Sequence, residues 1–267
     1  MRELLKRVVP RALREKTYPL RERLGRIPGH AAASWRLFRR VRFGRGPVAD
    51  LTVFEKRIHS QNGEDGVIEA IFALIGATNR FFVEFGVEDG LMCNTRRLKE
   101  RGWTGLQMDP REPSGPGVRR EFVTAENIES LLDKHGVPRA FDLLSIDIDG
   151  NDYWVWKAIS AHCPRVVVIE YNATILPPES RTIAYDPAFR FDATDYFGAS
   201  LAALQRLGRA KGYTLVACDS RGVNAFFVAD GLAAGRFAPP SLEKLYRPFS
   251  SPHRVPPHAP GRAWREV

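Results

Sequence analysis

The sequence predicts an α/β protein with an open, mainly parallel seven-stranded sheet and an antiparallel hairpin at its C-terminal end. Strand-like apolar runs alternate with helical stretches of about 10–15 residues, which is typical of parallel sheets with helices on both faces. The central runs DLLSI (142–146) and VVVI (166–169) are almost entirely apolar, as strands covered on both faces are. Finally, YTLVACDSRGVNAFFVA (213–229) reads as two strands joined by a D-S-R-G turn, which predicts the hairpin.

The elements follow one another in a regular order. The first helix is expected over 64–76, because its apolar residues recur at helical spacing and Gly76 can end it. Strands are then expected at 80–86, 103–110, 140–150 and 164–172, and helices at 93–102, 125–136, 152–160 and 198–212.

The chain divides into a basic arm (1–50), one domain (51–231) and a Pro-rich tail (232–267). Residues 1–46 carry 14 Lys/Arg and 3 Asp/Glu, a net +11, whereas the remainder carries 26 and 28, a net −2. The arm also has apolar residues at helical spacing, so it is expected to form short amphipathic helices that contact an anionic membrane surface or an acidic partner. The tail holds seven prolines without a clear period and is expected to be irregular.

The composition limits the cellular compartment and the kinds of structural site that are expected. The three cysteines, Cys93, Cys163 and Cys218, form no C-x-x-C pair, so a disulfide framework or structural zinc is not expected and a reducing compartment is favoured. Because no apolar run reaches the ~18–20 residues of a membrane span, the protein is expected to be cytoplasmic, with peripheral contact to the inner face of a membrane through the arm.

Acidic residues crowd the turn after the first strand, in FFVEFGVEDGLMCNT (81–95). Gly86 and Gly90 allow a ligand to approach the backbone closely, but the acids would repel a pyrophosphate. A cationic ligand is favoured instead, and S-adenosylmethionine carries a sulfonium and an ammonium group. Glu84 needs a partner within its apolar strand. Asn94 or Thr95 could cap the following helix.

Asp109 follows the second strand, 23 residues after Gly86. An acid at this place in a βαβ unit can accept hydrogen bonds from both hydroxyl groups of a ribose. The spacing is close to the ~20 residues expected for such a unit. Asp109 is therefore expected to bind the ribose of the cofactor, the alternative being a simple Asp-Pro turn.

A second group of acids follows the fourth and fifth strands. Asp147, Asp149 and Asp152 lie in SIDIDGND, and Glu170 and Asn172 lie in IEYN. Hard oxygen ligands of this kind suit Mg²⁺ or Mn²⁺, so Asp147, Asp149, Glu170 and Asn172 are candidate metal ligands. Alternatively, the catalytic group is Asp147, Asp149 or Glu170 acting as a general base, with its pKa raised by its neighbours. One of these acids is also expected to cap a helix.

Three stretches, SQNGEDG (60–66), FFVEFGVEDGLMCNTRRLKERGWTGLQMDP (81–110) and LLSIDIDGNDYWVW (143–156), resemble the FkbM-type S-adenosylmethionine-dependent methyltransferases. The resemblance covers about residues 54–230 and implies a Rossmann-like class I methyltransferase fold. It also implies cofactor contacts from Glu84, Gly86 and Asp109, with Gln61 and Asp65 over the cofactor and Asp147 at the reaction face. The turn GVEDG has Val-Glu where the family commonly has Ala-Asn.

The resemblance implies O-methylation, often of a sugar hydroxyl in a polysaccharide, glycolipid or glycosylated metabolite. The long loop 174–200 carries aromatic and basic residues and is expected to cover a small-molecule or glycan acceptor, with Tyr171, Tyr196 and Ser200 as candidate contacts. A nucleic-acid partner is not expected, since the acidic site would repel phosphates. The alternatives are a nucleic-acid or protein methyltransferase and a non-catalytic cofactor-binding protein docked to a membrane or partner.

Overall fold

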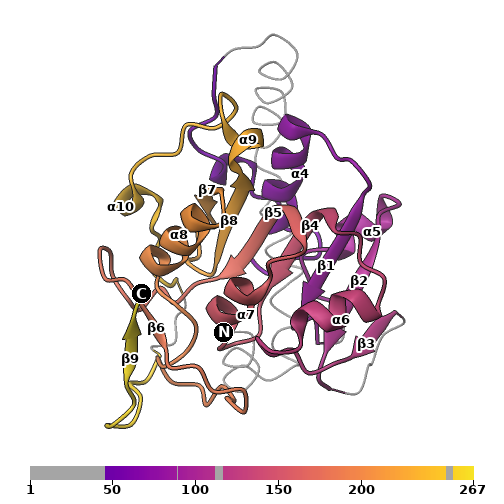
Figure 1. Cartoon of the computed structure of the whole chain (residues 1–267). Helices are drawn as coiled ribbons and strands as arrows, with labels where there is room; N and C mark the ends of the chain where they lie inside the picture. The colour runs from indigo at the N-terminus through magenta and orange to yellow at the C-terminus, as the bar shows by residue number, and fades with distance from the viewer. Residues whose placement is uncertain (1–45, 89, 112–116, 251–254) are drawn as a thin grey trace, which may run out of the picture.

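A seven-stranded sheet forms the centre of the molecule (Figure 1). The computed structural model describes residues 46–88, 90–111, 117–250 and 255–267, so nearly all of the basic arm lies outside the described residues. The strand order is β3-β2-β1-β4-β5-β8-β7. The strands are β1 (Phe81–Phe85), β2 (Thr104–Asp109), β3 (Val118–Arg120), β4 (Ala140–Ile146), β5 (Cys163–Glu170), β7 (Tyr213–Cys218) and β8 (Asn224–Ala229).

The first five of these strands run parallel, and β8 pairs antiparallel with both β5 and β7. This arrangement confirms the predicted fold class, including the hairpin at the sheet edge. The sequence pattern did not locate β3, because three residues are too few to show a period. The chain runs outward from β1 to β3 and then returns to β4 beside β1. Strand order therefore reverses between β1 and β4, which is where an open α/β sheet binds its ligands.

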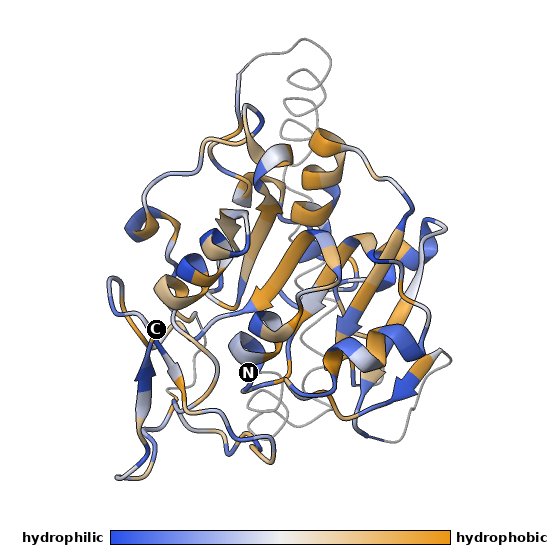
Figure 2. Ribbon diagram, in the orientation of Figure 1, coloured by the Kyte–Doolittle hydropathy of each residue, from blue (hydrophilic) through white to orange (hydrophobic). Residues whose placement is uncertain are grey.

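Helices cover both faces of the sheet. One face packs against α6 (Ile128–Lys134), α7 (Asp152–Ala158) and α8 (Leu201–Ala210), and the other against α4 (Glu64–Ile75) and α5 (Arg96–Glu100). Neighbouring residues of β1 divide between these layers, since Val83 belongs to the first core and Phe82 to the second. The central strands consist mainly of hydrophobic residues, which colour them largely orange in Figure 2.

The C-terminal segment is more ordered than its prolines suggest. It holds α10 (Leu242–Leu245) after α9 (Asp230–Ala233), and β9 (Trp264–Glu266) pairs antiparallel with β6 (Arg181–Ile183) in a separate small sheet. The buried hydroxyl group of Tyr171 donates to the Arg247 carbonyl over 2.7 Å, which ties the segment to the end of β5. Within its described residues, the tail that was expected to be irregular therefore contains short elements that pack against the domain. None of the described helices has the length and apolar character needed to cross a membrane.

Candidate functional site

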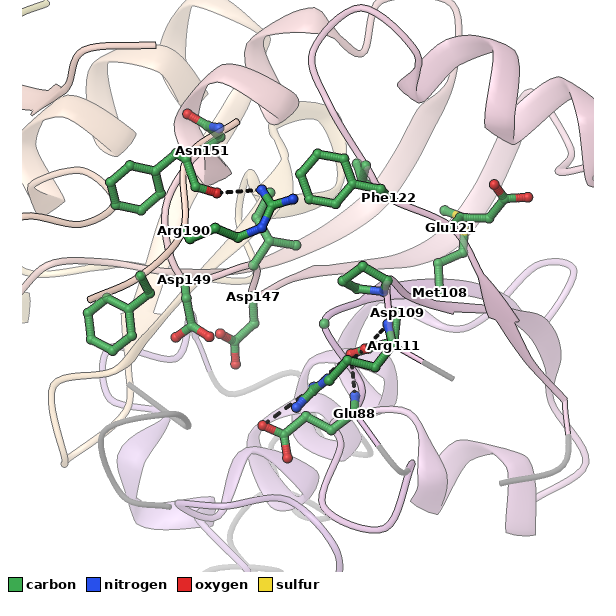
Figure 3. Close-up of a pocket in the computed structure, with 16 residues that line it drawn as sticks. Glu88, Met108, Asp109, Arg111, Glu121, Phe122, Asp147, Asp149, Asn151 and Arg190 are labelled. Carbon is green, nitrogen blue, oxygen red and sulfur yellow. Dashed lines mark hydrogen bonds and ion pairs between the residues drawn. The ribbon is translucent and has the colours of Figure 1, made fainter. Parts of the chain in front are cut away.

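A cavity of about 530 Å³ opens at the carboxyl ends of β1, β2 and β4 (Figure 3). This volume lies in the usual range of small-molecule sites, roughly 300–1,000 Å³. The walls come from Gly86 and Glu88, from residues 108–111 and 121–123, from 147–149 and Asn151, and from 189–191 of the long loop. The cavity therefore lies at the switch point between β1 and β4.

Gly86 brings the turn after β1 against the turn after β4. Its φ is +72°, and a Cβ added there would lie 1.7 Å from the carbonyl oxygen of Asp147. The backbones of the two turns are thus in direct contact. Only glycine fits this position, since it tolerates both the left-handed conformation and the close approach.

Glu84 lies behind the cavity rather than in its wall. Its buried carboxylate accepts hydrogen bonds from the backbone N–H groups of Asn94 and Thr95, over 2.7 and 3.2 Å, and from the Thr95 hydroxyl over 2.5 Å. The Gln107 amide donates to the same carboxylate over 3.3 Å. Glu84 therefore binds the segment that leads into α5, which answers its need for a partner, and a direct cofactor contact from it stays a prediction.

Asn94 and Gly90 also support the turn from outside the cavity. The Asn94 amide donates to the Ser145 hydroxyl over 3.0 Å, which links this turn to β4. Gly90 has a φ of +71°, and its N–H donates to the Val87 carbonyl over 2.8 Å. Neither residue lines the cavity, so both shape the turn without touching its contents.

Asp109 does line the cavity, at the end of β2. Only 1% of its surface is exposed, and its carboxylate accepts from the backbone N–H groups of Glu88 and Arg111, over 2.7 and 3.0 Å. The Arg111 guanidinium donates to both carboxylate oxygens, Nε to Oδ1 over 2.8 Å and an Nη to Oδ2 over 2.9 Å. Arg111 was not among the site residues expected from the sequence, although a basic residue two positions after an acid indicates a possible ion pair.

Three acids from β4 and β5 form a second polar group. One carboxylate oxygen each from Asp147, Asp149 and Glu170 lies within 4.8 Å of the others. Asp147 and Asp149 line the cavity, whereas Glu170 is almost completely buried behind them. Burial raises the pKa of Glu170 well above its usual value, and the neighbouring carboxylates raise it further.

Asp152, at the start of α7, holds the loop that carries these acids. Its two carboxylate oxygens accept from the N–H groups of Ile148 and Gly150, each over 2.9 Å. Asp149 between them has a left-handed φ of +57°, which is unusual for a residue other than glycine. Burial raises the pKa of Asp152 to about 7, and the charges of Asp147 and Asp149 add to this effect. Asp152 was expected only as one of several possible helix caps.

Gln61 and Asp65 lie at the entry to α4 and do not line the cavity. One oxygen of Asp65 accepts hydrogen bonds from three successive N–H groups, at residues 58–60, over 2.8–2.9 Å. Asp65 thus shapes the loop before α4, while its other oxygen, Oδ1, is buried without a hydrogen-bond partner among the described residues. Gln61 is buried in the same loop.

Four residues that were expected at a metal or at the acceptor make hydrogen bonds within the protein. The Asn172 amide donates to the carbonyls of residues 195 and 197, and its oxygen accepts from Thr174. Ser200 caps α8 by accepting from the Ala203 N–H over 3.1 Å. The hydroxyl groups of Tyr171 and Tyr196 donate hydrogen bonds to backbone carbonyls. None of the four lines the cavity, so their expected roles at a metal or an acceptor stay predictions without support from its geometry.

The long loop reaches the cavity through other residues. Phe189 packs against Gly150, where an added Cβ would lie 2.4 Å from its ring, and the Asn151 amide donates to the Asp186 carbonyl over 2.8 Å. The Arg190 guanidinium lies 4.3 Å from the centre of the Phe122 ring. The Phe189–Phe191 segment of the loop thus forms part of the cavity wall, while its expected contact with an acceptor stays a prediction.

Comparisons with known proteins give limited information. No family model matches the chain, and no curated protein matches it. A solved S-adenosylmethionine-dependent methyltransferase from Clostridium acetobutylicum is similar over 62% of this chain and 90% of its own, with 11% identity and a TM-score of 0.35. The small RNA methyltransferase HEN1 is similar over 66% of this chain, with 13% identity and a TM-score of 0.30, and the chain spans only 27% of its length. Similarities this weak carry no argument about activity.

Proposed function

We propose that this protein is an S-adenosylmethionine-dependent O-methyltransferase that acts on a hydroxyl group, with a sugar as the preferred class of acceptor. The observation that carries the proposal is a single cavity at the switch point with Asp109 on one side and Asp147 and Asp149 on the other. An acid after β2 suits a ribose diol, and acids after β4 suit a reacting hydroxyl.

The residues present suit this cofactor. The cavity is large enough for a nucleoside, and its acids favour a ligand with positive charge. When bound, S-adenosylmethionine would supply an electrophilic methyl group.

The second polar group would prepare the acceptor. Asp147 would take the proton of the hydroxyl, while Asp149 and the loop held by Asp152 orient it. Because burial raises the pKa of Glu170, this acid holds its proton to a higher pH than an exposed carboxyl group would. A divalent cation held by Asp147, Asp149 and Glu170 is the alternative, and it would replace that proton and acidify the hydroxyl.

The covering segment supports a ring-shaped acceptor. Phe189 and Phe191 line the cavity, and aromatic rings stack on the apolar face of a sugar. Excluding water from the reacting groups is a second effect of this cover. The acceptor would then lie between the rings and the acids of β4.

The test separates binding from transfer. Titration calorimetry with S-adenosylhomocysteine is expected to show binding to the native protein, and Asp109→Asn is expected to weaken it by roughly 10–100-fold, since it removes charge-assisted hydrogen bonds. Asp147→Asn should keep this affinity but abolish transfer of a radiolabelled methyl group to acceptors in a panel of sugars and glycans. Absence of any binding would refute the proposal, and unchanged transfer by Asp147→Asn would refute the assigned base.

A further inference from the structure

The carboxylate proposed to bind a ribose is already covered by a cation of the same chain. The Arg111 guanidinium binds both oxygens of Asp109 through Nε and an Nη, a bidentate arrangement that is stronger than a single contact. Asp109 is buried, but half of the Arg111 side chain (49%) is exposed. The Arg111 guanidinium therefore contacts Asp109 from the more exposed side, and both residues line the cavity.

A ribose diol and this guanidinium require the same acceptor atoms. Two further hydrogen bonds, from the backbone N–H groups of Glu88 and Arg111, already occupy other directions around the carboxylate. A carboxylate has about four lone-pair sites, so the diol can add its two donors only where the guanidinium now donates. The guanidinium must leave before a ribose can bind in this mode.

Glu88 offers the displaced guanidinium a second partner. Its Oε1 lies 3.7 Å from an Nη of Arg111, which is longer than a hydrogen bond but within ion-pair range. Glu88 also has a left-handed φ of +56°, so the turn presents this side chain in an uncommon backbone conformation. A small rotation of the Arg111 side chain would shorten the contact with Glu88 as the contacts with Asp109 break.

We propose that Arg111 is a specificity-determining residue that caps Asp109 until a ribose diol replaces it, with Glu88 receiving the displaced guanidinium. The proposal rests on the ribose-binding role of Asp109 proposed above. It accounts for Glu88, the residue at which the turn GVEDG departs from the pattern of the family it resembles. A ligand without two adjacent hydroxyl groups would gain too little at Asp109 to displace the cap.

Arg111→Met tests the cap by predicting a gain of affinity. The variant keeps the apolar stem and the backbone N–H bond to Asp109 but removes the competing guanidinium. S-adenosylhomocysteine is expected to bind it about tenfold more tightly than it binds the native protein, a difference of about 1.4 kcal/mol. Arg236→Met, which removes the same charge from an exposed helix end, should leave the affinity unchanged. 2′-Deoxyadenosine, compared with adenosine, reports whether the diol is the group recognised.

Glu88→Gln supplies a double-mutant cycle. It should weaken binding in the native background by about threefold. It should have no effect in the Arg111→Met background, because that variant has no guanidinium to pair with Glu88. Equal effects in both backgrounds would refute that role. Unchanged or weaker binding by Arg111→Met would overturn the cap while leaving the proposed function intact. No binding to either the native protein or Arg111→Met would instead refute the proposed function, and the cap with it.

Discussion

Two groups of carboxyl side chains lie at the same edge of the sheet, and their surroundings differ. Asp109, after β2, receives two backbone N–H groups and a bidentate arginine. Asp147, Asp149 and Glu170, after β4 and β5, face one another instead. The first arrangement surrounds its carboxylate with hydrogen-bond donors, whereas in the second burial and neighbouring acids raise the pKa of Glu170. Under the proposed function, the first group would recognise the ribose and the second would handle the proton of the acceptor.

The two groups meet at Gly86, so a side chain there is expected to have the largest effect. In Gly86→Ala the added Cβ would overlap the Asp147 carbonyl oxygen, and the residue would also keep an unfavourable left-handed φ. We expect a loss of about 3 kcal/mol or more in the free energy of unfolding, together with loss of ligand binding. Urea denaturation and calorimetry measure the two effects.

Gly76→Ala is the matched control. Gly76 has a similar φ of +69°, but an added Cβ would meet no atom within 4 Å. With its ψ of 157°, this position lies in a region that almost only glycine adopts, so the variant should show only the conformational cost of about 1–3 kcal/mol and bind ligand normally. Equal losses in the two variants would show that the turns are not locked together through Gly86, and the contrast between the two carboxyl groups would need another origin.

Asp152 offers a test of the acidic side through the pH dependence of stability. Burial raises its pKa from an ordinary value of 3.8 to about 7 in the folded protein. Between about pH 4 and pH 7 the folded form therefore holds a proton that the unfolded chain has lost, so stability falls as pH rises through this window. The slope from one such group is at most about 1.4 kcal/mol per pH unit.

Asp152→Asn should flatten this decline, by roughly 1–3 kcal/mol across the window. Asp219, whose pKa burial raises to about 8, contributes a decline of the same sign that the variant retains. Chemical denaturation at a series of pH values gives the two curves. The exposed control Asp50→Asn should run parallel to the native protein. An unchanged slope in Asp152→Asn would mean that this carboxyl group is already ionised at low pH.

The fold was readable from the sequence because its signals are local. Apolar periods, helix-ending glycines and the D-S-R-G turn each lie within one short segment, and these elements occur where expected. The strand β9 was missed for the opposite reason. Its three residues, Trp264–Glu266, carry no period of their own and become a strand only by pairing with β6, about 80 residues earlier in the sequence.

The candidate site was readable only in part. The place of Asp109 and Asp147 after their strands follows from topology, and both line the cavity. The partners of an acid depend instead on which groups approach it in three dimensions. Glu84 looked like a ligand-binding acid, yet the N–H groups at the start of α5 use its carboxylate, and nothing in its own segment revealed this.

A divalent cation would change the acidic side while leaving Asp109 untouched. Asp147, Asp149 and Glu170 offer oxygen ligands, and a bound cation would compete with protons for them, most of all at Glu170, whose pKa burial raises. We therefore expect Mn²⁺ at ten times its dissociation constant to stabilise the protein by about 1.4 kcal/mol, with tighter binding at pH 8 than at pH 6. Thermal unfolding with and without Mn²⁺ measures this, and Asp149→Asn should remove most of the gain. Equal Mn²⁺ stabilisation of the native protein and Asp149→Asn would place the cation elsewhere.

The smallest expected effect follows from removing the Phe122 ring, which forms part of the cavity wall. Phe122 is 38% exposed, lines the cavity and lies under the Arg190 guanidinium. In Phe122→Ala we expect S-adenosylhomocysteine to bind roughly fivefold more weakly, because the loss of one stacking surface is worth about 1 kcal/mol at an exposed position. The free energy of unfolding should change little, since the ring is not part of either core.

Leu176→Ala separates this effect from a general loss of exposed apolar surface. Leu176 is 58% exposed and does not line the cavity, so its truncation should leave the affinity unchanged. Weakening by Phe122→Ala alone would assign the ring to the ligand's flat base. Equal affinities in the two variants would instead indicate that Phe122 contacts the acceptor. Such a contact would affect methyl transfer and not the binding of S-adenosylhomocysteine.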